Sequence, residues 1–284
     1  AASDVYKSQL IMCNNIVGGK NMSHVLLIIL GFSIIFIATT LGAATIYLFK
    51  NNISQKLNTL FLGFAGGIMV AASIWSLIIP SLSQTEENMG KLSFIPAAIG
   101  IILGGFFLVG LDKIIPHFHK GTNEEEGPHI KIDKSIKLFL AVTIHNIPEG
   151  LAVGFAFGSA SLINTDASYI SALGLAIGIA IQNFPEGAAV SLPLEEIMHN
   201  KNKSFLFGMG SGAVEPVAAI IGFFLAKYLT FLQPWLLSFA AGAMLFVVAE
   251  DLIPDAKIEK NPHLGTWGFI IGFVLMMVLD LSLI

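Results

Sequence analysis

Two short polar motifs interrupt apolar stretches of this sequence in the same way. The first, His-Asn-Ile-Pro-Glu-Gly, occupies residues 145–150, and the second, Gln-Asn-Phe-Pro-Glu-Gly, occupies residues 182–187, 37 positions later (182 − 145). In each motif the first residue and the glutamate are four positions apart, so an α-helix places them on one face. The proline has no N–H and frees the carbonyl group four residues before it. A histidine nitrogen, carboxylates and amide oxygens at this spacing form a credible ligand set for zinc or a similar divalent ion.

The composition indicates that these motifs lie in a membrane. Of the 284 residues 55% are hydrophobic and only 12% are charged, and the mean hydropathy is +0.78. A soluble domain usually has about a quarter charged residues. Apolar runs long enough to cross a bilayer of about 30 Å recur along the chain. Eight such runs predict an all-α polytopic membrane protein: Val25–Phe49, Leu60–Ile79, Phe94–Leu111, Lys137–Gly158, Ser168–Leu192, Ser204–Tyr228, Pro234–Ile253 and Thr266–Ile284.

The basic residues predict the orientation of the chain. It has 15 lysines and no arginine, and placing the N-terminus outside leaves 4 lysines outside and 11 inside. The positive-inside rule therefore predicts that both termini are extracytoplasmic. The predicted sections are an outer tail (1–24), three spans (25–111), a cytoplasmic loop (112–136), the two motif helices (137–192) and three further spans (193–284).

Carboxylates in the middle of the membrane require a counter-charge. Glu149, Glu186 and Glu215 all lie in apolar runs, and a charge at the centre of the bilayer costs about 2.5–3.5 kcal/mol on insertion scales. No lysine lies in the core of a predicted span, so a divalent cation is the simplest counter-charge. Met69, midway along the second span, offers a thioether at the same level, or is an ordinary core methionine. A proton relay is compatible with metal binding, because ligands release protons when metal binds.

The repetition of the motif predicts an inverted repeat. The two motif helices are consecutive and therefore antiparallel, as are the second and seventh spans, which share a weaker likeness (FAGGIMVAASIWSLIIP and FAAGAMLFVVAEDLIP). Inverted repeats are typical of secondary transporters, whose substrate sites lie near the bilayer midplane. We therefore expect a 3+2+3 arrangement of eight helices.

The residues of the motifs resemble the ZIP (Zrt/Irt-like) family of divalent metal transporters. The resemblance covers essentially the whole chain, and "HNIPEG", "QNFPEG" and "SGAVEP" look like the bacterial-type branch. It implies a principal transport site and an adjacent second site. The residues that match the principal site are Met69, His145, Glu149, Gln182 and Glu186. Those that match the second site are Asn146, Asn183, Glu186 and Glu215.

The resemblance also carries expectations about mechanism. Where related sequences often have aspartate, this chain has Asn183, which removes a negative charge, so we expect a weaker second site. The family is thought to move helices one, four, five and six against helices two, three, seven and eight, and homodimers are common in it. The ion expected is Zn²⁺, with Fe²⁺, Mn²⁺ or Cd²⁺ as further substrates. The predicted direction is across the cell membrane toward the cytoplasm.

Polar residues outside the motifs have two interpretations each. The loop carries His117, His119 and His129, which either bind zinc loosely beside an acidic run or solvate a linker. Asp112, Glu250 and Asp251 at the inner helix ends either receive the ion on exit or simply end their helices. Asp280, near the outer end of the last span, is a candidate for attracting cations at the entrance.

Other function classes fit the sequence less well. A single cysteine excludes an internal disulfide and a CxxC metal pair, and no pattern for nucleic-acid binding is present. An intramembrane zinc hydrolase would need a second histidine, as in H-E-x-x-H, which neither motif has. The sequence therefore predicts a transporter rather than an enzyme, with a metal-selective channel or a hydrolase as the alternatives.

Overall fold

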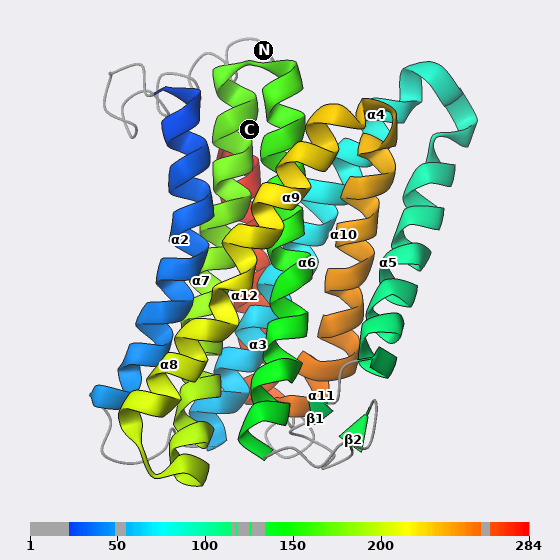
Figure 1. The fold of residues 1–284 in the computed structure, drawn as a ribbon. Helices are drawn as coiled ribbons and strands as arrows, with labels where there is room; N and C mark the ends of the chain where they lie inside the picture. The colour runs from blue at the N-terminus through cyan, green and yellow to red at the C-terminus, as the bar shows by residue number, and fades with distance from the viewer. Residues whose placement is uncertain are drawn as a thin grey trace.

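The computed structural model describes residues 23–48, 55–114, 117–118, 125–126, 134–256 and 262–283, and these are almost entirely helical (Figure 1). The prediction of an all-α protein is confirmed for this part of the chain. The helices are α2 (His24–Ala44), α3 (Gln55–Ala72), α4 (Ile79–Met89), α5 (Phe94–Ile114), α6 (Lys134–Ile163), α7 (Asp166–Met198), α8 (Lys201–Gly212), α9 (Val214–Tyr228), α10 (Gln233–Val247), α11 (Ile253–Asp255) and α12 (Pro262–Leu283). Short 3₁₀ turns lie at Thr45–Tyr47, Gly90–Leu92 and Thr230–Leu232.

Seven helical segments within the described ranges are long and apolar enough to cross a membrane. These segments are His24–Tyr47, Thr59–Glu86, Gly90–Leu111, Asp166–Leu192, Lys201–Tyr228, Thr230–Leu252 and His263–Ser282. They correspond to seven of the eight predicted runs. The remaining run lies in α6, which is 30 residues long and carries the first polar motif. Figure 1 shows α6 running within the bundle beside α7 and α9, and shows that α2 begins and α12 ends at the same end of the bundle.

The long helices pack in two groups. In the first group α2 packs along α7 and α6 packs along α9, and α6 also contacts α7. In the second group α3 packs along α12 and α5 packs along α10. Contacts of α3 with α7 and of α10 with α6 join the two groups. Both polar motifs thus belong to the first group.

Glycines bring the helices within each group into backbone contact. A Cβ atom at Gly42 would lie 2.0 Å from the carbonyl oxygen of Phe184 on α7, so α2 and α7 approach this closely only with glycine there. In the second group a Cβ atom at Gly67 would lie 2.0 Å from the carbonyl oxygen of Phe269 on α12. Small residues at such crossings are the usual means of close helix packing in membranes.

Glycine is also present where the two groups meet, but with a different neighbour. A Cβ atom at Gly178 of α7 would lie 2.1 Å from the sulfur of Met276 on α12. Met276 is fully buried, and Gly178 contacts its flexible side chain rather than a backbone carbonyl group.

Two π-helical segments interrupt the helices of the weaker sequence repeat. Ser73–Ile78 joins α3 to α4, and Val248–Leu252 joins α10 to α11. A proline follows each segment by two residues, at Pro80 and Pro254. Because proline cannot donate to the carbonyl four residues back, an insertion before it is a common way to adjust the helix. The likeness between the second and seventh predicted spans therefore extends to their backbone.

The predicted loop 112–136 contains two short strands. His117–Phe118 (β1) pairs antiparallel with Glu125–Glu126 (β2), which places His117 opposite Glu126. His119 and His129 lie outside the described residues, as do residues 1–22 of the predicted N-terminal tail.

Candidate metal-transport site

The two motifs meet at the contact between α6 and α7. The side-chain amide of Gln182 donates a hydrogen bond to the Oε1 atom of Glu149 at 2.5 Å. Gln182 is completely buried and Glu149 is 1% exposed. The first residue of the second motif, Gln182, is therefore hydrogen-bonded to the glutamate of the first motif.

The asparagine of the second motif holds the glutamate of α9. Glu215 lies in the first turn of α9 and is completely buried. Asn183 donates to its Oε2 atom at 2.6 Å, and the hydroxyl of Thr39 on α2 donates to its Oε1 atom at 2.9 Å. Sequence reasoning had missed Thr39. The one available signal was a hydroxyl residue in the middle of an apolar run.

The asparagine of the first motif contacts backbone instead. Asn146 donates to the carbonyl oxygen of Ser211 at 2.9 Å, close to the break between α8 and α9. Carbonyl groups near a helix end lack some of their helical partners, so an amide donor stabilises this break.

Four buried oxygen atoms of the motifs have no hydrogen-bond donor in the described structure. They are Oδ1 of Asn146, Oε2 of Glu149, Oε1 of Gln182 and Oδ1 of Asn183. A buried polar atom without a partner is costly, and such atoms are uncommon in native structures. Carboxylate and amide oxygens are suitable ligands for a divalent cation. The residues thus fit a cation, because their free oxygens are of the type that a cation binds.

The other predicted ligands of the principal site are in different surroundings. His145 is paired with Asp251 of the second π-helical segment, with 3.2 Å between Nε2 and Oδ2. Met69 is 1% exposed on α3. Glu186 is partly exposed and makes no hydrogen bond or ion pair with the described residues. In the described ranges no three His, Cys, Asp or Glu side chains are close enough together to hold a metal ion, so the full predicted ligand set is not gathered here.

The predicted entrance and exit residues differ in their surroundings. Asp280 is 2% exposed, accepts a hydrogen bond from the hydroxyl of Ser76 at 2.6 Å, and has a second oxygen without a donor. Of the acids in the second π-helical segment, Glu250 is exposed and Asp251 is buried. Asp112 lies in the last turn of α5. Asp280 is thus placed inside the second group of helices rather than on the surface.

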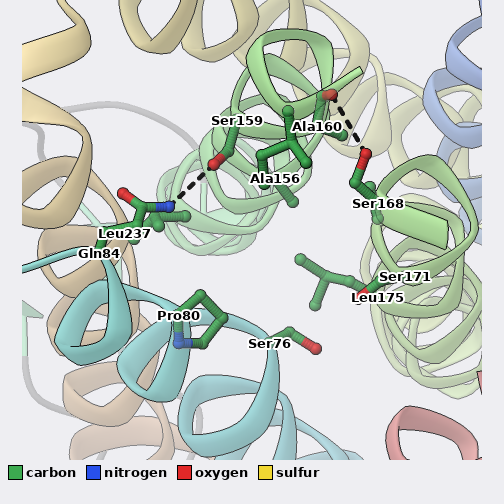
Figure 2. Close-up of a pocket in the computed structure, with 12 residues that line it drawn as sticks. Ser76, Pro80, Gln84, Ala156, Ser159, Ala160, Ser168, Ser171, Leu175 and Leu237 are labelled. Atoms are coloured by element: carbon green, nitrogen blue, oxygen red, sulfur yellow. Dashed lines mark hydrogen bonds between the residues drawn. The ribbon is translucent and has the colours of Figure 1, made fainter. Parts of the chain in front are cut away.

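A cavity lies between the two groups of helices (Figure 2). Its volume is about 130 Å³, and it is lined by residues of the first π-helical segment, α4, α6, α7 and α10. Hydroxyl and amide groups supply its polar wall, and Gln84 of α4 donates to Ser159 of α6 at 3.0 Å beside it. Ser76, which donates to Asp280, also lines this cavity.

Comparison with known proteins shows the family. A sequence model described as "ZIP Zinc transporter" matches residues 122–280. The chain belongs to the ZIP zinc transporter family. It is 35% identical to zinc transporter ZIP11 of Homo sapiens over 86% of this chain and 94% of that protein. It is also 35% identical to zinc transporter ZIPB of Bordetella bronchiseptica, over 95% of this chain and 85% of that protein.

A third relative extends the comparison. The chain is 32% identical to zinc transporter ZupT of Clostridium perfringens, over 92% of this chain and 97% of that protein. These relatives are transporters rather than enzymes. Together with the seven long apolar helices of the described residues, family membership shows that the chain is an integral, multi-pass membrane protein that transports metal ions.

Proposed function

We propose that this ZIP-family protein carries Zn²⁺ across the cell membrane toward the cytoplasm, with Fe²⁺, Mn²⁺ and Cd²⁺ as further substrates. The observation that carries the proposal is the set of four donor-free oxygens on the two motif helices, which a cation would satisfy. The names of the relatives favour zinc as the ion.

The proposed site uses the residues of both motifs. The principal ion is bound by Met69, His145, Glu149, Gln182 and Glu186. Nε2 of His145 lies against Asp251 in this structure, so binding of the ion through this nitrogen requires the ring to move from that carboxylate. The adjacent second site, with Asn146, Asn183, Glu186 and Glu215, is weaker because Asn183 carries no charge.

Eight spans with both termini outside complete the proposed topology, and the packing supports an inverted repeat. A 3+2+3 repeat exchanges the first span with the sixth, the second with the seventh, the third with the eighth and the fourth with the fifth. Under this exchange the α2–α7 pair becomes the α9–α6 pair, and the α3–α12 pair becomes the α10–α5 pair. The four most extensive helix pairs of the structure are therefore consistent with the repeat that the motifs predicted.

We propose that the first group of helices moves relative to the second during transport. Elevator-type transport needs one body that carries the ion and one that stays in place. The first group carries both motifs, and glycine contacts hold its helices together. The cavity beside Gln84 and Ser159 lies between the groups and is the proposed entrance, with Asp280 behind it. Glu250 and Asp251 are the proposed exit.

Zinc flux into sealed liposomes carrying the purified protein tests the proposal. We expect saturable uptake that is lost in Glu149→Ala and reduced in His145→Ala. Uptake that rises without saturation would favour a channel over a carrier. Binding of zinc without any uptake would contradict transport and would call for a search for hydrolysis. Chemical cross-linking in the same liposomes tests the homodimer that the family implies.

A further inference from the structure

Thr39 makes an unusual hydrogen bond for a threonine inside an apolar helix. A hydroxyl in a helix commonly bonds to the carbonyl group four residues back. Thr40 does this, with 2.8 Å between its Oγ1 atom and the carbonyl oxygen of Phe36. Thr39 is 3.2 Å from the corresponding carbonyl of Ile35 but 2.9 Å from the carboxylate of Glu215. Both acceptors are within hydrogen-bond distance, and the shorter of the two bonds leaves the helix toward α9.

The carboxylate of Glu215 is consequently occupied on both oxygens. Thr39 donates to Oε1, and Asn183 donates to Oε2. Glu149 differs, since Gln182 donates to its Oε1 atom and its Oε2 atom has no donor in the described structure. Of these two buried glutamates, one keeps an oxygen for a cation and the other has both oxygens bound to protein donors.

Helix packing makes Thr39 the counterpart of Glu215 in the repeat. A Cβ atom at Gly150 would lie 2.3 Å from the carbonyl oxygen of Glu215, and one at Gly187 would lie 2.1 Å from that of Thr39. The glycine that ends each motif thus contacts the backbone of one of these two residues. A Cβ atom at Gly212 would also lie 2.7 Å from the Cβ atom of Thr39, so the backbone of α8 packs closely against the Thr39 side chain.

We propose that Thr39 and Asn183 together take the place of a second metal ion at Glu215, so that the site binds one transported ion rather than two. Thr39 is then a residue that determines the occupancy of the site, acting through Glu215. This inference rests on the proposed function, because it concerns the number of ions at the same transport site.

The test counts the zinc ions bound to the purified full-length protein by equilibrium dialysis and elemental analysis. We expect one ion in the wild type, and one in Thr39→Ser, which keeps the hydroxyl. Asn183→Asp returns a negative charge beside Glu215, and we expect a second ion to bind. Adding Thr39→Val to Asn183→Asp removes the competing donor at nearly constant volume. The second ion should then bind about tenfold more tightly, as expected for a lost hydrogen bond to a charged group.

A second comparison keeps the test decisive if the double variant does not fold. Glu215→Gln removes the charge at the second position, and we expect it to bind one zinc ion, as the wild type does. Two ions in the wild type and one in Glu215→Gln would overturn the inference. The metal-free melting temperature is an independent measure, and it should fall in Thr39→Val relative to Thr39→Ser, because the buried Oε1 atom loses its donor. Equal melting temperatures would also contradict the inference.

Zinc uptake by the same wild-type preparation separates this inference from the proposed function. Uptake together with two bound ions would overturn the occupancy and leave the transport. One bound ion without uptake would overturn the transport.

Discussion

The two motifs share a sequence pattern, but the first residue of each contacts a different group of helices. Gln182, in the second motif, donates to Glu149 within the first group of helices. His145, in the first motif, is paired with Asp251, which belongs to the second group. The first residue of one motif thus contacts its own group of helices, and the first residue of the other motif contacts the second group.

The asparagines and glutamates of the motifs differ in the same manner. Asn146 donates to a backbone carbonyl, whereas Asn183 donates to the carboxylate of Glu215. Glu149 is fully buried and hydrogen-bonded, whereas Glu186 is partly exposed. Equivalent positions of the two motifs therefore make different contacts in the structure.

Of the variants considered, removal of the Glu149 side chain should reduce zinc uptake the most. Glu149→Ala deletes both a proposed ligand and the negative charge that compensates the ion, so we expect zinc uptake to fall by more than about 100-fold. Glu195→Ala, an acid on the same α7 helix as the second motif but outside it, is the control and should retain normal uptake. Full uptake by Glu149→Ala in liposomes would rule out the proposed site.

Replacing the glycine that ends either motif should destabilise the protein to a similar extent, because the repeat predicts equivalent packing for both. Gly150→Ala and Gly187→Ala both place a Cβ atom against a backbone carbonyl, and overpacking of this kind costs about 1–3 kcal/mol of stability. The measurement is the unfolding free energy in detergent. Gly110 of α5 has no atom within 4 Å of its Cβ position, so Gly110→Ala should not destabilise the protein. A Gly187→Ala variant as stable as Gly110→Ala would contradict the packing.

The first residue of the first motif should set metal preference. His145→Ala removes a nitrogen ligand, which suits zinc better than manganese, so the ratio of zinc to manganese uptake should fall by about tenfold. Competition assays in liposomes measure this ratio. His263→Ala, in the exposed first turn of α12, is the matched control. An unchanged ratio in His145→Ala would mean that His145 is not a ligand.

Loss of the hydrogen bond between Gln84 and Ser159, beside the cavity, should have the smallest effect on zinc uptake. Ser159→Ala removes the acceptor of the Gln84 hydrogen bond, which is worth about 0.5–1.5 kcal/mol. If the groups must separate there during transport, the initial uptake rate should rise by no more than about tenfold. Ser83→Ala, whose hydroxyl bonds within its own helix, should leave the rate unchanged. A lower rate in Ser159→Ala would show that the bond assists transport.

Much of the fold could be predicted because the signals are local. Seven of the eight predicted apolar runs are helical segments long and apolar enough to cross a membrane in the described structure, and the two motifs lie on helices that pack together. The second span was predicted to end at Ile79, but the helix continues to Met89 because a π-helical segment accommodates Pro80. Local hydropathy does not register such an insertion.

The partners in the site were not predictable, because they depend on contacts between distant segments. Thr39 and Glu215 are 176 positions apart, and a hydroxyl residue in an apolar run gives no sign of its partner. The same holds for His145 and Asp251, which sequence reasoning had assigned to different steps of transport. Asp280 was predicted to lie at the entrance, and nothing in the sequence indicated its hydrogen bond from Ser76, 204 positions away.

The contact of Gly178 with Met276 differs from the glycine–backbone contacts at Gly42 and Gly67 in what it allows. Where glycine meets backbone, a displacement of one helix along the other forces rigid atoms together, so those pairs move as one body. A methionine side chain has three rotatable bonds and can change rotamer as a neighbouring helix passes. We therefore expect the boundary between α7 and α12 to allow small sliding steps that need only side-chain rearrangement.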